Sequence, residues 1–413
     1  MNDRKCFVLN WHWSLWYYTV IFTSTISTYT NVWPQGKALD SSYPSKGSFP
    51  SVLFNQISKE NENKNIIISP FSIQSALTLL YMGAEGNTAK EFQNLLHFSS
   101  SNKTEIAENF QRIKNSMMAS SGQKAQIQSA ERIYTRFNLV PKFNQIASKY
   151  FQAQAEKVNF NLREQTANKI NTWVENNTNN KITNLISPES IDDHTTAILV
   201  NALYFKAPWA NQFNKRLTRK KPFYMSARKS VNVDTMSDEI TCKYVRIPEL
   251  DATAIELRYE DTDLVMDVIL PNEVSGLKDL ENSISVMDLG KLFENVTEEE
   301  VKVNLPKFRI EFETGLIPVL QDMGMKESFQ YGANYTGIFN TKVPVKVSDV
   351  IHKAFIEVNE FGSEAAASTY TKLVYLSAFS DAEETFTADH PFMFVIRNPS
   401  TVYFVGHVKN FDS

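Results

Sequence analysis

Hydrophobic positions recur with a helical period in several parts of the chain, and these parts predict helices. One helix is expected to begin at Ser69-Pro70, because serine caps a helix and proline fits its first turn. The residues that follow are apolar nearly all round up to Gly83, which indicates a buried helix. Two further amphipathic helices are marked by Pro141, Phe143, Ile146, Tyr150 and Phe151 and by Ala167, Ile170, Trp173 and Val174.

Strand patterns lie between these helices. Residues 196–205 (TAILVNALYF) are continuously apolar, as expected of a central strand that is covered on both faces. Apolar and polar residues alternate over 133–139 and again over 301–305, and 351–358 reads as another strand. The C-terminal end predicts two strands joined by a turn at 398–400. Interleaved helices and strands of this kind predict the α+β class with large mixed sheets.

The N-terminus resembles a signal peptide. Arg4 and Lys5 give it a positive start, and residues 13–22 form an apolar stretch about as long as the core of such a leader. We predict a signal peptide over 1–27, a flexible extension over 28–48 and one domain over 49–413. An uncleaved membrane anchor is the alternative, but the apolar run is short for a span of about 20 residues.

Composition and charge narrow the classes of partner. The 413 residues carry 42 basic and 46 acidic side chains, a net charge of −4, which gives no reason to expect nucleic acid or a membrane as partner. Cys6 lies in the predicted leader, so Cys242 is expected to be a lone structural or surface thiol, with a reactive thiol as the alternative. Four Asn-x-Ser/Thr sequons are candidate glycosylation sites of a secreted protein: Asn102, Asn176, Asn295 and Asn334.

Motifs of enzyme chemistry are missing from the sequence. Its six histidines form no H-E-x-x-H zinc pattern, and there is no C-x-x-C, no G-x-S-x-G and no phosphate-binding glycine loop. We therefore predict no catalytic residues, no metal and no cofactor. A Ser/His/Asp triad can be built from residues far apart in the sequence without any of these motifs, so a hydrolase stays open as an alternative function.

The segment 357–380 (EVNEFGSEAAASTYTKLVYLSAFS) does not read as part of a core. Gly362 is a candidate hinge, since glycine is free in φ and ψ. The alanine run after it suggests a short surface helix. With a period of two, however, small uncharged side chains share one face, so the segment also fits a strand that slides between two others. That face carries Ser363, Ala365, Ala367 and Thr369.

The pattern around this segment resembles the hinge and reactive-centre loop of the serpin family. Four other stretches also resemble serpin motifs, in the family's order: residues 65–92, residues 199–213 as the central strand of the main sheet, residues 305–311 as the next strand of that sheet, and residues 386–396. The resemblance covers the chain after the leader. It implies a serpin fold, with three sheets, about eight to nine helices and an exposed loop at about 360–385.

The resemblance also assigns residues. The scissile bond is expected between Leu376 and Ser377, fourteen residues after the hinge glycine, with Tyr375 or the Phe379–Ser380 bond as alternatives. The hinge is Glu360, Gly362, Ser363, Glu364, Ala365, Ala366, Ala367 and Thr369. A polar cluster beneath the main sheet, which we call the shutter, comprises Ser69, Ser72, Asn201 and His352. A cluster where the loop enters the sheet, which we call the breach, comprises Trp209, Lys307 and Glu360.

These assignments imply a secreted, monomeric suicide inhibitor. Its partner is a chymotrypsin-like serine protease, or one like elastase or cathepsin G, which it holds in a covalent complex. Heparin is not expected, because the helix near 103–118 lacks a basic cluster. The alternative is a non-inhibitory serpin that acts as carrier, storage protein or chaperone. Phe361 departs from the family pattern, which has a polar residue just before the hinge glycine.

Overall fold

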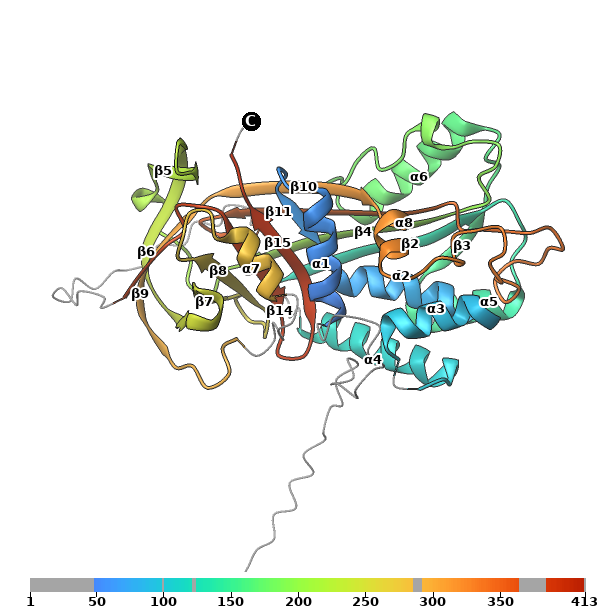
Figure 1. Cartoon of the computed structure of the whole chain (residues 1–413), viewed down its shortest axis with the longest axis horizontal. Coiled ribbons are helices and arrows are strands. Elements are labelled where there is room, and N and C mark those ends of the chain that lie inside the picture. The colour runs from blue at the N-terminus through green and yellow to red at the C-terminus, as the bar shows by residue number, and fades with distance from the viewer. Residues whose placement is uncertain (1–47, 99, 121–123, 285–291, 364–383, 412–413) are drawn as a thin grey trace, which may run out of the picture.

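The computed structural model describes residues 48–98, 100–120, 124–284, 292–363 and 384–411. In these ranges the chain is an α+β fold in which helices surround two hydrogen-bonded sheets (Figure 1). The helices are α1 (Phe49–Glu60), α2 (Pro70–Gly83), α3 (Gly86–Leu96), α4 (Lys103–Ser120), α5 (Pro141–Ile146), α6 (Arg163–Asn177), α7 (Leu277–Ile284) and α8 (Ile317–Asp322). The strands are β1 (Ile66–Ile68), β2 (Gln126–Thr135), β3 (Gln154–Lys157), β4 (Ala197–Pro208), β5 (Arg219–Ser226), β6 (Lys229–Ile247), β7 (Ala252–Arg258), β8 (Val265–Pro271), β9 (Glu298–Pro306), β10 (Phe308–Gly315), β11 (Asp349–Asn359), β12 (Gly362–Ser363), β13 (Glu384–Thr387), β14 (Phe392–Arg397) and β15 (Val402–Val408).

The six-stranded sheet has the order β10-β11-β12-β4-β2-β3. Its central strand β4 is buried on both faces, as its continuous apolar run predicts. Leu199 and Leu203 face the main core, whereas Val200 and Tyr204 face a second core beneath α6. Figure 1 shows α6 on one side of this sheet and α2 to α4 on the other.

The nine-stranded sheet runs β1-β15-β14-β8-β7-β6-β9-β13, with β5 also paired to β6. The resemblance implies three sheets in all. In the described residues two of them are joined, because β6 is one continuous strand of 19 residues that pairs with β5, β9 and β7 in turn. None of the described helices is both long and apolar enough to cross a membrane.

Several predicted elements are confirmed. Helix α2 runs from Pro70 to Gly83, and the Ser69 side chain caps it by accepting a hydrogen bond from the backbone N–H of Ser72. Helix α5 begins at Pro141 and continues as a π-helical turn to Phe151. The C-terminal strands β14 and β15 pair as an antiparallel hairpin.

Two predicted strands have different limits. The strand expected over 133–139 is β2, which begins at Gln126 and ends at Thr135. It ends there because the hydroxyl of Thr135 accepts the N–H of Phe137, which turns the chain. The stretch 305–311 is not one strand of the main sheet: β9 ends in the nine-stranded sheet and β10 begins in the six-stranded one, with Lys307 between them.

Two glycines bring the end of α2 against the segment before β11. The N–H of Gly337 donates to the carbonyl of Gly83 at 3.0 Å. A Cβ on Gly337 would lie 2.7 Å from that carbonyl oxygen and 2.8 Å from the Cα of Gly83. The neighbouring atoms are backbone, so they have little freedom to move aside.

We therefore expect Gly337→Ala to lower the free energy of unfolding by about 1–3 kcal/mol, the usual cost of overpacking. Gly332→Ala is the matched control, because a Cβ there meets nothing within 4 Å. Denaturant unfolding followed by tryptophan fluorescence compares the two variants. Equal stability of both would show that the close approach of the glycines is unimportant.

Candidate functional site

The chain reverses direction after β11 and begins a new strand inside the six-stranded sheet. Strands β11 and β4 pair in parallel only between 349–355 and 198–204. Beyond this stretch they separate, and β12 (Gly362–Ser363) lies between them, antiparallel to both. The first residues of the predicted loop thus already occupy a strand position.

Gly362 is required for this arrangement. Its φ is +149°, in the region that favours glycine. A Cβ there would lie 2.1 Å from the carbonyl oxygen of Ala207 on β4. The predicted hinge glycine therefore lies so close to β4 that it leaves no room for a side chain.

Ser363 is fully buried. Its hydroxyl lies 2.7 Å from the phenol oxygen of Tyr259, and the Tyr259 ring stacks on Trp209 with centroids 4.6 Å apart. Burial raises the pKa of Tyr259, so the phenol stays protonated. Sequence reasoning missed Tyr259, because no motif marks a contact between residues 104 positions apart.

The structure brings the three predicted breach residues together around the turn. Lys307 Nζ lies 3.1 Å from a carboxylate oxygen of Glu360, and the hydroxyl of Thr218 donates to the same carboxylate at 2.8 Å. The Trp209 indole N–H donates to the carbonyl of Asn359 at 3.0 Å, and its backbone N–H donates to the carbonyl of Phe361. The turn is thus held through both its side chains and its backbone.

Electrostatics keep the Glu360 carboxylate charged. Burial alone would raise its pKa, but hydrogen bonds from its own backbone and from Thr218, together with Lys307, outweigh burial and lower the pKa below its usual value. Phe361, which stands where the family has a polar residue, is half-buried in this turn, and its N–H donates to the Asn359 side chain.

The four predicted shutter residues form one buried hydrogen-bonded chain. Asn201 on β4 donates to the Ser72 hydroxyl at 2.6 Å, and its carbonyl oxygen lies 2.7 Å from His352 Nδ1 on β11. The Ser69 N–H donates to His352 Nε2 at 3.1 Å. Because Nε2 accepts, the ring proton is on Nδ1 and donates to Asn201. This bond crosses between β4 and β11, where the two strands pair directly.

A second buried polar group lies next to the shutter and was not predicted. Glu131 on β2 is the register partner of Asn201 and accepts a hydrogen bond from the Ser75 hydroxyl at 2.8 Å. Burial raises the pKa of Glu131 and lowers that of Lys114 on α4, while the opposite charge of each partly offsets the shift of the other. The Lys114 ammonium also donates to the carbonyl of Phe151.

The remaining predicted residues divide into three groups. Cys242 is buried, and burial raises the pKa of its thiol to about 12, which fits a structural and unreactive cysteine. The sequon asparagines Asn102, Asn176, Asn295 and Asn334 are all exposed. Their occupancy stays a prediction. The hinge residues 364–367 and 369 and the predicted bond Leu376–Ser377, with its alternatives, lie outside the described residues.

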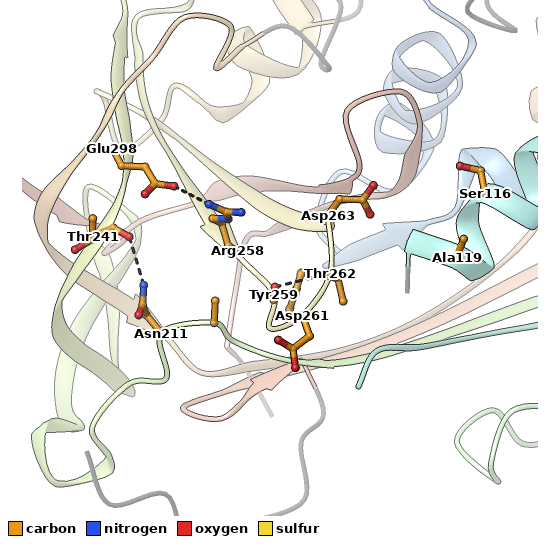
Figure 2. Close-up of a pocket in the computed structure, with 11 residues that line it drawn as sticks. Ser116, Ala119, Asn211, Thr241, Arg258, Tyr259, Asp261, Thr262, Asp263 and Glu298 are labelled. Atoms are coloured by element: carbon orange, nitrogen blue, oxygen red, sulfur yellow. Dashed lines mark hydrogen bonds and ion pairs between the residues drawn. The ribbon is translucent and has the colours of Figure 1, made fainter. Parts of the chain in front are cut away.

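An open cleft of about 780 Å³ lies beside Tyr259. Figure 2 shows the residues that line it. Its walls come from the end of α4, the segment after β4 and the turn between β7 and β8. Two ion-pair or hydrogen-bond contacts cross it, Arg258 to Glu298 and Asn211 to the carbonyl of Thr241. Among the described residues that line it, Ser116 is the only serine and there is no histidine or cysteine, so these residues form no nucleophile–base pair.

Comparison with known proteins agrees with this geometry. The family model described as "Serpin (serine protease inhibitor)" matches residues 45–411. "Serine protease inhibitor 42Dd" of Drosophila melanogaster is 38% identical over 359 residues, covering 86% of this chain and 94% of that protein. "Antichymotrypsin-2" of Bombyx mori is 32% identical over 364 residues, covering 87% and 95%. The crystal structure of Serpin48 from Tenebrio molitor superposes with a TM-score of 0.80 at 33% identity, covering 88% and 96%.

The buried imidazole of His352 predicts a pH dependence of stability. Burial lowers its pKa to about 3, against about 6.5 in the unfolded chain. The unfolded state therefore binds a proton first as the pH falls. The stability that depends on the neutral ring is complete above pH 6.5 and is lost progressively between pH 6.5 and 3.

We expect His352→Gln to flatten this pH dependence, because a glutamine amide accepts and donates similar hydrogen bonds without titrating. Thermal unfolding midpoints at pH 7.5, 6, 5 and 4 measure the effect. Wild type should lose more stability than the variant over this range. Parallel curves for the two proteins would contradict the assignment of His352 as the titrating group.

Proposed function

The chain belongs to the serpin family, and from that premise we propose that it is a suicide inhibitor of chymotrypsin-like serine proteases with Leu376–Ser377 as its bait bond. The protease attacks the loop as a substrate and forms an acyl-enzyme. Cleavage frees the hinge side of the loop, which then enters the six-stranded sheet between β11 and β4. From Gly362 to Leu376 the inserted strand would extend by about 50 Å.

The single observation that carries this proposal is β12. A two-residue strand already lies between β11 and β4, hydrogen-bonded to both, at the end of the sheet where these strands separate. The cleaved loop would therefore enter the sheet where β12 already separates β11 from β4. Insertion only lengthens β12 as the direct pairing of β11 with β4 opens.

The register of β12 says where each later residue would go. Continued along β11, it places Ala365 beside Ile356 and Ala367 beside Ala354, both of which are fully buried. It places Thr369 between His352 and Asn201, whose hydrogen bond must break as the strands part. The threonine hydroxyl donates and accepts, so it can replace that bond on either side.

The opposite face of the inserted strand would meet a different environment. Glu364 would lie beside Lys206 on β4 and Glu357 on β11, which are both only half-buried. A charge is therefore tolerated at Glu364 but not at Ser363, which faces the core and is fully buried. The hinge sequence has the same alternation, because the charged Glu364 stands between the small, uncharged Ser363 and Ala365.

The expected specificity follows from the residue before the bait bond. Leu376, with Tyr375 and Phe379 near it, suits a hydrophobic specificity pocket, and no lysine or arginine stands at that position. The name of the silkworm relative, "Antichymotrypsin-2", supports the same class of target.

We expect a covalent complex with chymotrypsin that survives a denaturing gel. Mass spectrometry of the released C-terminal peptide should give Ser377 as its first residue. A peptide that begins at Leu376 or Ser380 would move the bond to one of the alternatives. Complete loop cleavage without any complex would instead support a non-inhibitory serpin, and turnover of peptide substrates by the protein itself would support a hydrolase.

We also expect Ser363→Arg to turn the inhibitor into a substrate. Arginine does not fit the buried position that Ser363 already occupies in β12, so the substitution displaces β12 before cleavage, and insertion must then bury an unpaired guanidinium at a cost of several kcal/mol. Each 1.4 kcal/mol on the insertion barrier slows insertion about tenfold. Deacylation of the acyl-enzyme is then faster than loop insertion, so the protease is released in its active form. Glu364→Arg is the matched control, because its side chain would face half-exposed neighbours.

For both variants, the measurement is the ratio of covalent complex to cleaved inhibitor on a denaturing gel. The control should trap protease nearly as well as wild type. If Ser363→Arg also traps protease one to one, Gly362 is not the hinge of an inserting strand.

A further inference from the structure

A strongly basic segment lies between the end of β4 and the middle of β6. Seven of the chain's 42 basic residues fall within 215–229, and no aspartate or glutamate occurs from 210 to 233. In a protein whose net charge is −4, this is a local concentration of positive charge. The seven are Lys215, Arg216, Arg219, Lys220, Lys221, Arg228 and Lys229.

Most of these charges face solvent. Of the seven, only Lys221 is half-buried, and its ammonium donates to the Asn304 side chain at 2.7 Å. Lys220 pairs with Asp234 at 3.1 Å, while Arg219 donates to backbone carbonyls. Within the described ranges, no acidic side chain forms an ion pair with Lys215, Arg216 or Arg228, so their charge stays available to a partner.

The acids nearest in sequence are already engaged. Asp234 pairs with Lys220, and Asp238 accepts the backbone N–H of Asn214 at 2.8 Å. Across the sheet, Asp389 contacts its neighbour His390. Among the described residues, Asp234 thus neutralises one member of the segment, Lys220, and none of these three acids pairs with Lys215, Arg216 or Arg228.

Two exposed apolar side chains lie among the charges. Leu217 is 44% exposed and Tyr224 is 40% exposed. Arginine and tyrosine are enriched at protein–protein interfaces. A sulfated polysaccharide, the other anionic partner to consider, would gain little from contact with an exposed leucine. The mixture favours a protein surface as the partner.

The segment is hydrogen-bonded to both ends of the reactive loop. On one side the hydroxyl of Thr218 donates to Glu360, two residues before the hinge glycine. On the other side the N–H of Tyr224 donates to the carbonyl of Asp389, two residues after β13. In Figure 1, β5 and the start of β6 lie at the end of the molecule opposite α3 and α5.

We propose that this basic segment, residues 215–229, is a docking surface for an acidic patch on the target protease itself. The inference rests on the proposed function, because a protease that attacks the loop must approach the end of the molecule where both loop ends are rooted. Long-range attraction there raises the rate of encounter rather than the chemistry of acylation.

The test compares native chymotrypsin with chymotrypsin whose lysines were succinylated in the zymogen, before activation. Succinylation makes the protease surface acidic and leaves the catalytic residues unmodified. We expect wild type to react at least tenfold faster with the succinylated enzyme at low salt, and this ratio to shrink in 0.5 M NaCl.

The variant is Lys215→Glu, Arg216→Glu and Arg228→Glu combined, with serine at the same three positions as a milder version. The control places the same charge change elsewhere on the exposed surface: Lys90→Glu, Lys142→Glu and Lys342→Glu. The variant should lose the preference for the succinylated enzyme, the control should keep most of it, and both should keep the wild-type ratio of complex to cleaved inhibitor.

The docking surface is tested by the rate constants of the reaction with chymotrypsin, whereas the proposed function is tested by the formation of a covalent complex. Each can therefore be contradicted without the other. If chymotrypsin only cleaves the loop, inhibition is wrong, but kcat/KM for that cleavage still reports docking. Equal rates with both enzymes, or equal effects of variant and control, would overturn the docking surface. Retention on a heparin column that the variant abolishes, with no change in protease rates, would overturn it in favour of a polysaccharide site.

Discussion

The direct pairing of β4 with β11 is the contact on which the rest of this protein depends. The two strands run parallel and meet only over 198–204 and 349–355, and β12 fills the gap beyond. A third strand between them would exchange one ladder for two, and each hydrogen bond gained stabilises by about 0.5–1.5 kcal/mol. The sheet as it stands is therefore the less fully bonded arrangement of these strands, as the proposed insertion of the cleaved loop requires.

What holds β4 and β11 together is partly polar, and this matters for how they separate. The bond between His352 and Asn201 is buried beneath the sheet, with Ser69 and Ser72 of the α2 start completing the chain. A purely apolar contact would offer nothing to an incoming strand, whereas a hydrogen bond can pass to a new partner without leaving a buried group unsatisfied. A neutral imidazole fits this depth, since burial disfavours its charged form.

Local sequence was sufficient where one short stretch decides the structure. Ser69-Pro70 starts α2, the apolar run over 196–205 is the central strand, and the predicted hinge glycine Gly362 begins β12. Contacts between distant segments were not predictable in the same way. The bond of Ser363 to Tyr259, the pair of Glu131 with Lys114 and the continuity of β6 through two groups of strands depend on how the chain folds back, and no local pattern encodes them.

The hinge segment after Gly362 and the basic segment 215–229 are subject to different physical constraints. Under the proposed mechanism, the hinge face of the loop must fit between strands, so Ser363, Ala365, Ala367 and Thr369 have to be small and uncharged whatever protease is met. The basic segment 215–229 is bonded to both loop ends but belongs to β5, β6 and the turn before them, which neither flank nor receive the inserting strand. Its charges can therefore change without obstructing insertion. If the proposed insertion and the proposed docking both operate, the residues that enter the sheet and the charges that attract a protease are therefore separate, and the charge of the basic segment can vary while the hinge stays the same.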